Sequence, residues 1–60
     1  MVMKYSELKV GDWFKIIRNN DNNVYVKMEY GFHLVVNPKI AYRPLFATTK
    51  VFKMEKQGDF

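Results

Sequence analysis

The amino-acid sequence predicts an all-β domain, a small barrel of five short antiparallel strands, and three observations support this fold class. Apolar residues recur at every second position along most of the chain, which is the period of a strand with one buried face. β-Branched and aromatic residues dominate the same segments. A chain of 60 residues has room for one hydrophobic core, so we expect a single domain over residues 1–60.

The first element is an irregular opening over residues 5–12. Its pattern places Leu8 and Val10 on one side of the chain. Gly11 and Asp12 then offer a tight turn or a β-bulge, because glycine adopts backbone conformations that are closed to other residues.

Residues 13–17 follow as the first full strand. Alternation sets Phe14 and Ile16 on one face and Trp13 and Lys15 on the other. Because the Lys15 ammonium prefers water, the face that carries it is expected to point outward. We therefore expect Phe14 and Ile16 in the core and Trp13 at least partly exposed.

The next two segments are expected to form a hairpin. Residues 18–23 are rich in Asn and Asp, which tolerate turn conformations, so this segment is the expected hairpin tip. Residues 24–29 alternate in character, which predicts a half-buried strand. The expected inward residues are Val24, Val26 and Met28, and the expected outward residues are Tyr25, Lys27 and Glu29.

Three further strands are expected in the second half of the chain. A turn at residues 30–31 leads to a strand over residues 32–37, and two short strands follow at residues 45–49 and 50–55. Residues 56–60 are expected to be a frayed tail. Short antiparallel strands in so small a chain favour a barrel of the SH3 type, since closure removes exposed strand edges.

Sequence motifs add a family resemblance. Residues 8–14 read LKVGDWF, residues 24–27 read VYVK, and a late strand contains Val51. With these motifs the chain resembles small SH3-like-barrel proteins encoded by bacteriophages, which open with Leu-x-x-Gly-Asp-x-Phe and continue to a Val-Tyr-x-Lys strand. It departs from them at residues 35–38 and 42–44, where VVNP and YRP replace the usual Asn-Ala-Val-Asn-Leu segment and glycine turn. The resemblance implies a phage setting and a barrel, and it implies no activity.

The composition indicates a protein of a reducing compartment. The chain has no cysteine, which excludes a disulfide framework and a thiolate metal site. It lacks the basic start and apolar stretch of a signal peptide, and its apolar runs are far shorter than the roughly 20 residues of a spanning helix. We therefore expect a cytoplasmic protein, in the host cell if a phage encodes it, with no membrane span.

Residues suited to catalysis are few. Ser6 is the only serine and His33 the only histidine, and they lie on different expected elements. The loop around Asp21 lacks the spaced acidic ligands of a calcium site, and one histidine without cysteine cannot form a closed zinc site. We therefore expect no enzyme, no cofactor and no metal. A surface position for His33 is expected, with a pH-sensitive contact there left open.

The first candidate binding surface is an aromatic patch made of Trp13, Tyr25, Lys27, Tyr30 and Tyr42. Tyrosine and tryptophan contribute much of the binding energy in protein interfaces. Aromatic rings beside lysine also stack on the bases of single-stranded nucleic acid. The same rings would instead complete the core if the strand register were shifted by one residue.

The second candidate surface is a basic rim made of Lys39, Arg43, Lys50 and Lys53. Residues 38–54 contain no acidic residue, and the whole chain carries a net charge of +4. Such a rim would bind phosphates or an acidic protein surface. The alternative interpretation is that these basic side chains are solvated and only keep a small barrel soluble.

These surfaces favour a non-catalytic binding module, and three hypotheses follow from them. The leading one is a phage-encoded accessory protein that binds a host or phage protein and modulates it. The second is a small barrel that binds single-stranded DNA or RNA by stacking and by basic residues. The third is a structural component that self-associates, because a small core gains stability from oligomerisation.

Overall fold

The computed structural model describes residues 1–18 and 22–55 of the chain. It has one 3₁₀ turn, η1 (Tyr5–Glu7), and its strands are β1 (Val2–Lys4), β2 (Trp13–Ile16), β3 (Tyr25–Lys27), β4 (Phe32–Leu34), β5 (Ala41–Tyr42) and β6 (Lys50–Met54). All six strands join one antiparallel sheet, so the predicted all-β class is confirmed for the described residues. Part of the expected hairpin tip (19–21) and the expected tail (56–60) lie outside the described residues.

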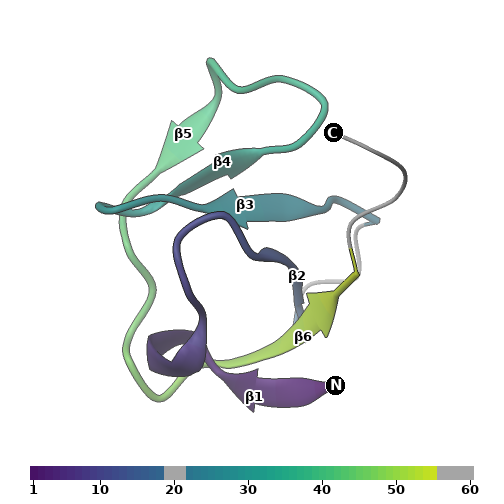
Figure 1. Ribbon diagram of the computed structural model, residues 1–60, viewed down its shortest axis with the longest axis vertical. Coiled ribbons are helices and arrows are strands. Elements are labelled where there is room, and N and C mark those ends of the chain that lie inside the picture. Colours follow the sequence, from purple (N-terminus) through teal and green to yellow (C-terminus); the bar gives the residue numbers. More distant parts are fainter. Residues whose placement is uncertain (19–21, 56–60) are drawn as a thin grey trace.

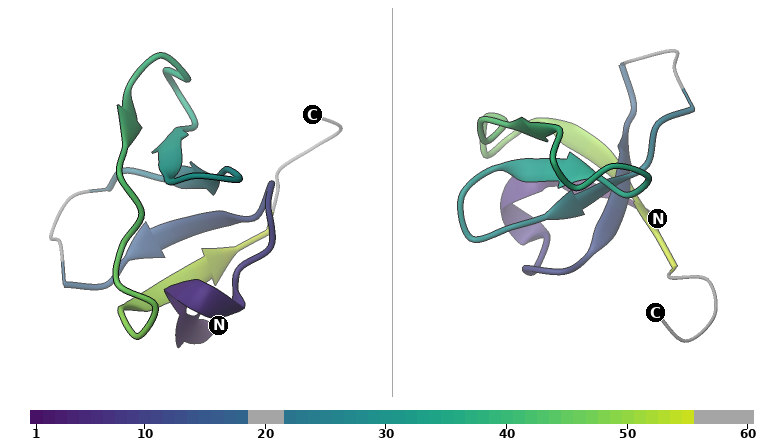
Figure 2. Two further views of the ribbon diagram at one scale, coloured as in Figure 1. Left: turned by 90° about the vertical axis from the view of Figure 1, so that its left-hand side faces the viewer. Right: turned by 90° about the horizontal axis from the view of Figure 1, so that it is seen from above.

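The strand order of the sheet is β1-β6-β2-β3-β4-β5 (Figure 1). Strands β2 to β5 form a meander, and β6 returns to lie between β1 and β2. The sheet bends so that β4 and β5 lie on the far side of β3 from β1 and β6 (Figure 1). The connection from β5 to β6 runs along one side of the molecule, past the ends of the central strands (Figure 2).

Two parts of the strand prediction are wrong. Residues 45–49 form a turn instead of a strand, because the Thr49 N–H donates to the Phe46 carbonyl at 3.0 Å. Strands β1 and β5 have three and two residues, which is too short for alternation to reveal them. The sheet therefore has six strands instead of five, and its edge strands β1 and β5 are not paired with each other.

The hydrophobic core lies on the inner face of the bent sheet. Alternation in β2 is as predicted, since Phe14 is fully buried and Ile16 nearly so. The complete set of buried hydrophobic residues in the described part of the chain is Tyr5, Leu8, Phe14, Ile16, Tyr25, Phe32, Leu34 and Val51. Four of these are aromatic, so edge-to-face ring contacts supply much of the packing.

Tyr5 lies at the centre of this core and joins parts of the sheet that do not pair. Its ring contacts Phe14 of β2 and Phe32 of β4 edge to face, at centroid distances of 5.9 and 6.1 Å. Its hydroxyl donates to the Gly31 carbonyl at 3.2 Å, just before β4. Because η1 follows directly after β1, Tyr5 links the N-terminal edge of the sheet to the β3–β4 hairpin.

The turn before β2 explains the first sequence motif. The Asp12 carboxylate accepts the Lys9 N–H at 2.8 Å, and the Asp12 N–H donates back to the Lys9 carbonyl at 3.0 Å. Gly11 has a φ of 94°, which favours glycine, and its N–H donates to the Lys27 carbonyl at 2.7 Å. With Leu8 buried before the turn, Val10 is exposed, so the expected shared side for these two residues is wrong.

Gly31 lies where the backbone of the β3–β4 turn passes close to that of β5. Its φ is 77°, and a Cβ atom there would collide with the carbonyl oxygen of Tyr42. The neighbouring Met28 N–H donates to the Gly31 carbonyl at 2.9 Å, which closes the β3–β4 turn. The hairpin therefore passes against β5 at a point where only glycine fits.

Substituting Gly31→Ala is expected to destabilise the fold far more than Gly11→Ala. Both residues have positive φ, which costs alanine about 1 kcal/mol or more, but only Gly31 adds a collision with backbone. We expect a loss of about 3 kcal/mol for Gly31→Ala and about 1 kcal/mol for Gly11→Ala, measured by urea unfolding. Equal losses would contradict the close approach of the hairpin to Tyr42.

Substituting Tyr5→Phe is expected to cost about 1 kcal/mol at neutral pH, because it removes one buried hydrogen bond. Burial raises the pKa of Tyr5 above its ordinary value of 10.0, while the unfolded chain keeps that value. Above pH 10.0 the unfolded state therefore binds fewer protons at Tyr5 than the folded state does. The contribution of Tyr5 to the free energy of unfolding is complete below pH 10.0 and is lost as pH rises through the raised pKa. The unfolding free energies of the two proteins should converge as pH rises above 10.0, and a constant difference would contradict this assignment.

Candidate nucleic-acid interface

The predicted aromatic patch is divided between the core and the surface. Tyr25 is only 4% exposed, so its predicted outward orientation is wrong. The register gives the reason, because Tyr25 lies opposite Phe14 and shares its inward face. Tyr42 stacks on Phe32 with ring centroids 5.1 Å apart, while Tyr30 is exposed in the turn before β4.

The other two members of the predicted patch, Trp13 and Lys27, lie on opposite faces of the sheet. Trp13 is partly exposed on the outer face of the sheet, opposite Val26 of β3 and Met54 of β6. The Lys27 Nζ lies 5.1 Å from the centroid of the Tyr5 ring, which is a cation–π contact with the core. Of the five predicted residues, Trp13 alone belongs to the surface described below.

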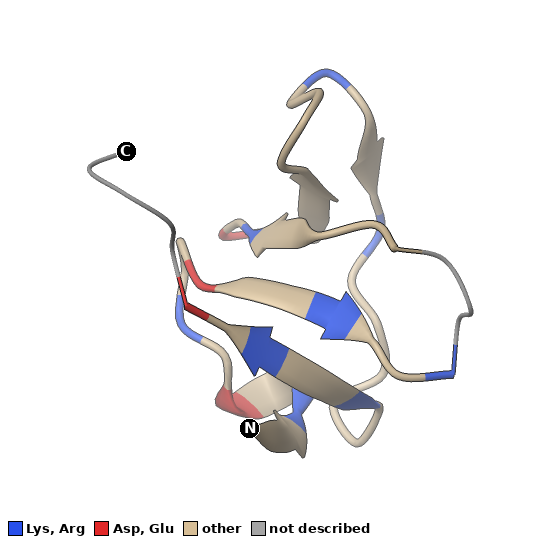
Figure 3. Ribbon diagram, turned by 90° about the vertical axis from the view of Figure 1, so that its right-hand side faces the viewer, with Lys and Arg blue, Asp and Glu red and all other residues tan. Residues whose placement is uncertain are grey.

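The predicted basic rim is also dispersed. Lys39 lies in the turn between β4 and β5, and Arg43 directly follows β5 at one edge of the sheet. Lys50 and Lys53 belong to β6, which strands β2, β3 and β4 separate from β5. Figure 3 shows the Lys and Arg positions on β2 and β6 together in one view. The structure therefore divides the rim between two regions.

The structure instead brings together seven outward residues of three adjacent strands, which we call the outer face. Strands β1, β6 and β2 lie side by side, and Met3, Val51, Phe14 and Ile16 mark their inward positions. Alternation places the remaining residues of these strands outward, except Lys53 at the end of β6. The outer face consists of Val2, Lys4, Trp13, Lys15, Lys50, Phe52 and Met54.

The register arranges the outer face in three rows across the strands. In the first row Lys4 of β1 lies opposite Lys50 of β6. In the second, Phe52 lies between Val2 and Lys15.

The third row pairs Trp13 with Met54 and continues over β3 and β4 through Val26 and His33. Lysines therefore occupy one end of the outer face, and the two aromatic rings Phe52 and Trp13 occupy successive rows. The first row is therefore charged, the second is mixed, and the third is mainly apolar on these three strands.

The charge on the outer face has a single sign. Its seven positions, all of which the structure describes, include Lys4, Lys15 and Lys50 and no acidic residue. Lys4 and Lys50 are directly opposite each other, an arrangement that costs stability in a sheet. The nearby Glu7 carboxylate accepts the Lys4 backbone N–H at 2.8 Å. An anion bound between these lysines would relieve their repulsion.

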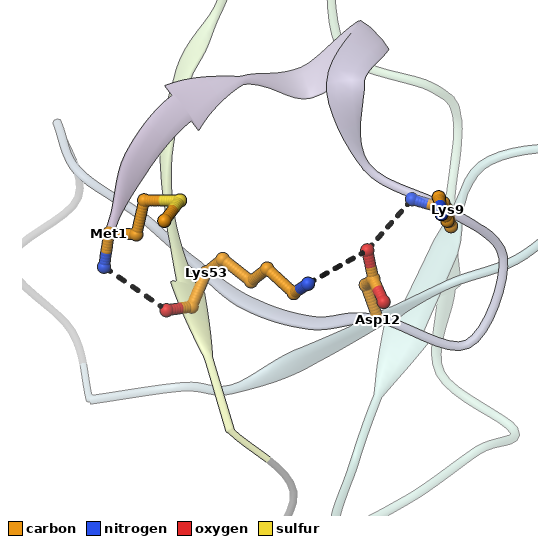
Figure 4. A network of polar contacts seen from close by, with 4 residues as sticks. All are labelled: Met1, Lys9, Asp12 and Lys53. Atoms are coloured by element: carbon orange, nitrogen blue, oxygen red, sulfur yellow. Dashed lines mark hydrogen bonds and ion pairs between the residues drawn. The ribbon is translucent and has the colours of Figure 1, made fainter.

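A pocket of about 410 Å³ borders the outer face at the far end of β6. It is lined by Met1, Asp12, Trp13, Lys53, Met54 and Glu55. The Lys53 ammonium lies 3.8 Å from the Asp12 carboxylate, and the Met1 amino group lies 3.5 Å from the Lys53 carbonyl (Figure 4). The ion pair is partly exposed, so it contributes little stability, but it balances one negative and one positive charge within the pocket.

Within the described part of the chain, the residues considered for catalysis and metal binding lie on different elements. No cluster of three or more His, Cys, Asp or Glu side chains among them is placed to hold a metal ion. His33 lies on the outward side of β4, where its Nδ1 is 2.8 Å from the Leu34 carbonyl, while Ser6 lies in η1. Asp21 lies outside the described residues. No helix in the described ranges, 1–18 and 22–55, has the length and hydrophobicity needed to cross a bilayer.

Five members of the outer face were not predicted as binding residues from the sequence, namely Val2, Lys4, Lys15, Phe52 and Met54. The missing information was the pairing of β1 with β6, because β1 is too short to be recognised. One signal was present in the sequence, since alternation from Val51 places Phe52 and Lys50 on the same face.

Comparison with known proteins identifies no relative of this chain. No protein-family model, curated protein or solved structure matches the chain. The outer face is therefore the basis for an inference about function.

Proposed function

We propose that this protein binds single-stranded nucleic acid on its outer face and catalyses no reaction. The observation that carries the proposal is the arrangement of three lysines and two aromatic rings on adjacent strands, with no outward acidic residue in those three described strands. Proteins that bind single strands without sequence readout combine these same two elements, a positive surface for the backbone and rings for the bases.

The aromatic rings are spaced for stacking. Phe52 lies opposite Lys15, and Trp13 lies opposite Met54, so Phe52 and Trp13 are diagonal neighbours on adjacent strands. Diagonal neighbours in an antiparallel sheet have a separation of about 7–8 Å, a spacing that suits two rings that contact two different bases. Phe52 is 43% exposed, which leaves part of its ring open to a ligand.

The lysines are placed for the backbone of the same strand. Lys15 lies beside Phe52 in one row, and the Lys4–Lys50 pair forms the next row along β6. A phosphate near that pair would reduce the repulsion between the two ammonium groups. Three lysine–phosphate contacts predict a salt dependence with a slope of about −2, at about −0.7 for each contact to a single strand.

We also propose that the sheet is a variant of the SH3-like barrel and that the chain is a phage-encoded accessory protein of the host cytoplasm. The four-stranded meander with a final strand returning beside β2 supports the first part. The motif around Gly11 and the buried Tyr25 support the second, because they supply the turn and strand that the resemblance requires.

A second function, binding of a host or phage protein, has its own observation. Val2 is 58% exposed beside Phe52, and Met54 lies beside Trp13, so the outer face also has an aliphatic part. Aromatic and methionine side chains are enriched at the centre of protein interfaces. The lysines would then form a rim suited to an acidic protein surface.

The test is titration of the protein with an oligothymidylate of about ten nucleotides while the fluorescence of Trp13, the single tryptophan, is recorded. We expect saturable quenching and a logarithmic salt slope of about −2. Lys15→Met should reduce the slope by about 0.7, and Phe52→Ala should weaken binding by about 1–3 kcal/mol.

The matched control is Lys39→Met, which removes the same charge from a turn outside the outer face. It should leave the slope and affinity close to those of the unsubstituted protein. Equal effects of Lys15→Met and Lys39→Met would show attraction by net charge alone and contradict the assigned face. Absence of quenching at low salt would favour the protein-binding function.

A further inference from the structure

A turn between β5 and β6 presents an exposed phenylalanine. Phe46 is 81% exposed, while the preceding Leu45 packs against the core. Exposing so large an apolar side chain to water is unfavourable compared with burying it. Among the described residues, Phe46 is the aromatic side chain with the largest exposed fraction, so a partner would bury most of it.

The turn that carries Phe46 is held in place by backbone hydrogen bonds. The Thr49 N–H donates to the Phe46 carbonyl at 3.0 Å, and the Ser6 N–H donates to the Ala47 carbonyl at 3.1 Å. The Tyr5 N–H also donates to the Thr49 carbonyl at 2.8 Å, so η1 holds the turn from one side. A side chain on an ordered turn loses little backbone entropy when it binds.

The pocket at the far end of β6 has the apolar lining and the size that a phenylalanine side chain requires. Met1, Trp13 and Met54 supply apolar walls, and its volume of about 410 Å³ exceeds that of a phenyl ring. The Lys53–Asp12 ion pair balances its own charges, so these two residues do not demand a charged ligand. Glu55 adds a carboxylate beside the apolar walls.

Phe46 and the pocket cannot meet within one molecule. The turn ends where β6 begins at Lys50, and the pocket lies where β6 ends, next to Met54 and Glu55. A strand of five residues spans about 17 Å at about 3.3 Å per residue. A contact between the turn and the pocket therefore requires two molecules.

We propose that Phe46 of one copy of this chain inserts into the pocket of a second copy, in a head-to-tail contact. Lys50 follows the turn and Glu55 lies at the pocket, so docking brings opposite charges toward each other. Each addition leaves one turn and one pocket free, so the contact is open-ended. One inserted ring covers less surface than a stable interface of about 1,000 Å², so we expect weak association that requires a high protein concentration.

Sedimentation over a concentration series, without nucleic acid, tests this contact. The unsubstituted protein is expected to associate, whereas Phe46→Ser and Met54→Glu are each expected to remain monomeric. Val36→Ser is the matched control, because Val36 is an apolar residue that is 87% exposed in another loop, and it should associate like the unsubstituted protein. Thermal unfolding checks that each variant keeps its fold.

A mixture of the two monomeric variants tests whether Phe46 of one molecule meets the pocket of another. Phe46→Ser keeps an intact pocket, and Met54→Glu keeps an intact turn, so the mixture should form a one-to-one pair and nothing larger. A monomeric unsubstituted protein at every concentration would overturn the proposal, as would a mixture that stays monomeric. Neither result bears on nucleic-acid binding, because no nucleic acid is present.

Discussion

The buried side chain of Tyr5 is the constraint on which the rest of the fold depends. Strands β1 and β5 are not paired with each other, so backbone hydrogen bonds alone do not hold the two ends of the sheet together. Tyr5 makes that connection through ring contacts with Phe14 and Phe32 and a hydrogen bond to Gly31. The Lys27 ammonium covers the same ring. Packing around one aromatic side chain thus maintains the bend that a closed barrel would obtain from strand pairing.

Fixing the inner face also fixes what the outer face displays. Once Phe14 and Val51 are committed to the core, their strand neighbours must point to solvent. Phe52, Lys15 and Lys50 are therefore held on a rigid sheet instead of flexible loops. A binding surface built on strands keeps its geometry without a ligand, which favours recognition by shape and charge. The fold and the proposed function thus share one physical cause.

The sequence predicted the parts of the fold that depend on local chemistry and missed those that depend on pairing. Alternation identified Phe14 and Ile16 correctly, and the glycine signal located the turn at Gly11. Tyr25 was assigned to the wrong face, because its neighbours are valines that look better suited to a core. Its position opposite Phe14 decides its orientation. The hydrophobic pattern of a single strand does not reveal that register. For the same reason, Trp13 and Lys50 were identified singly, but the surface that they share was not.

The proposed function requires the outer face of β1, β6 and β2 to be the binding surface. Amide chemical shifts recorded by NMR during titration with an oligothymidylate test this claim most directly, because they report on every strand at once. We expect the largest changes on β6 and β2, around Phe52 and Lys15, with little change around Lys39 and Arg43. Changes centred on the β4–β5 turn, with an unaffected β6, would contradict it.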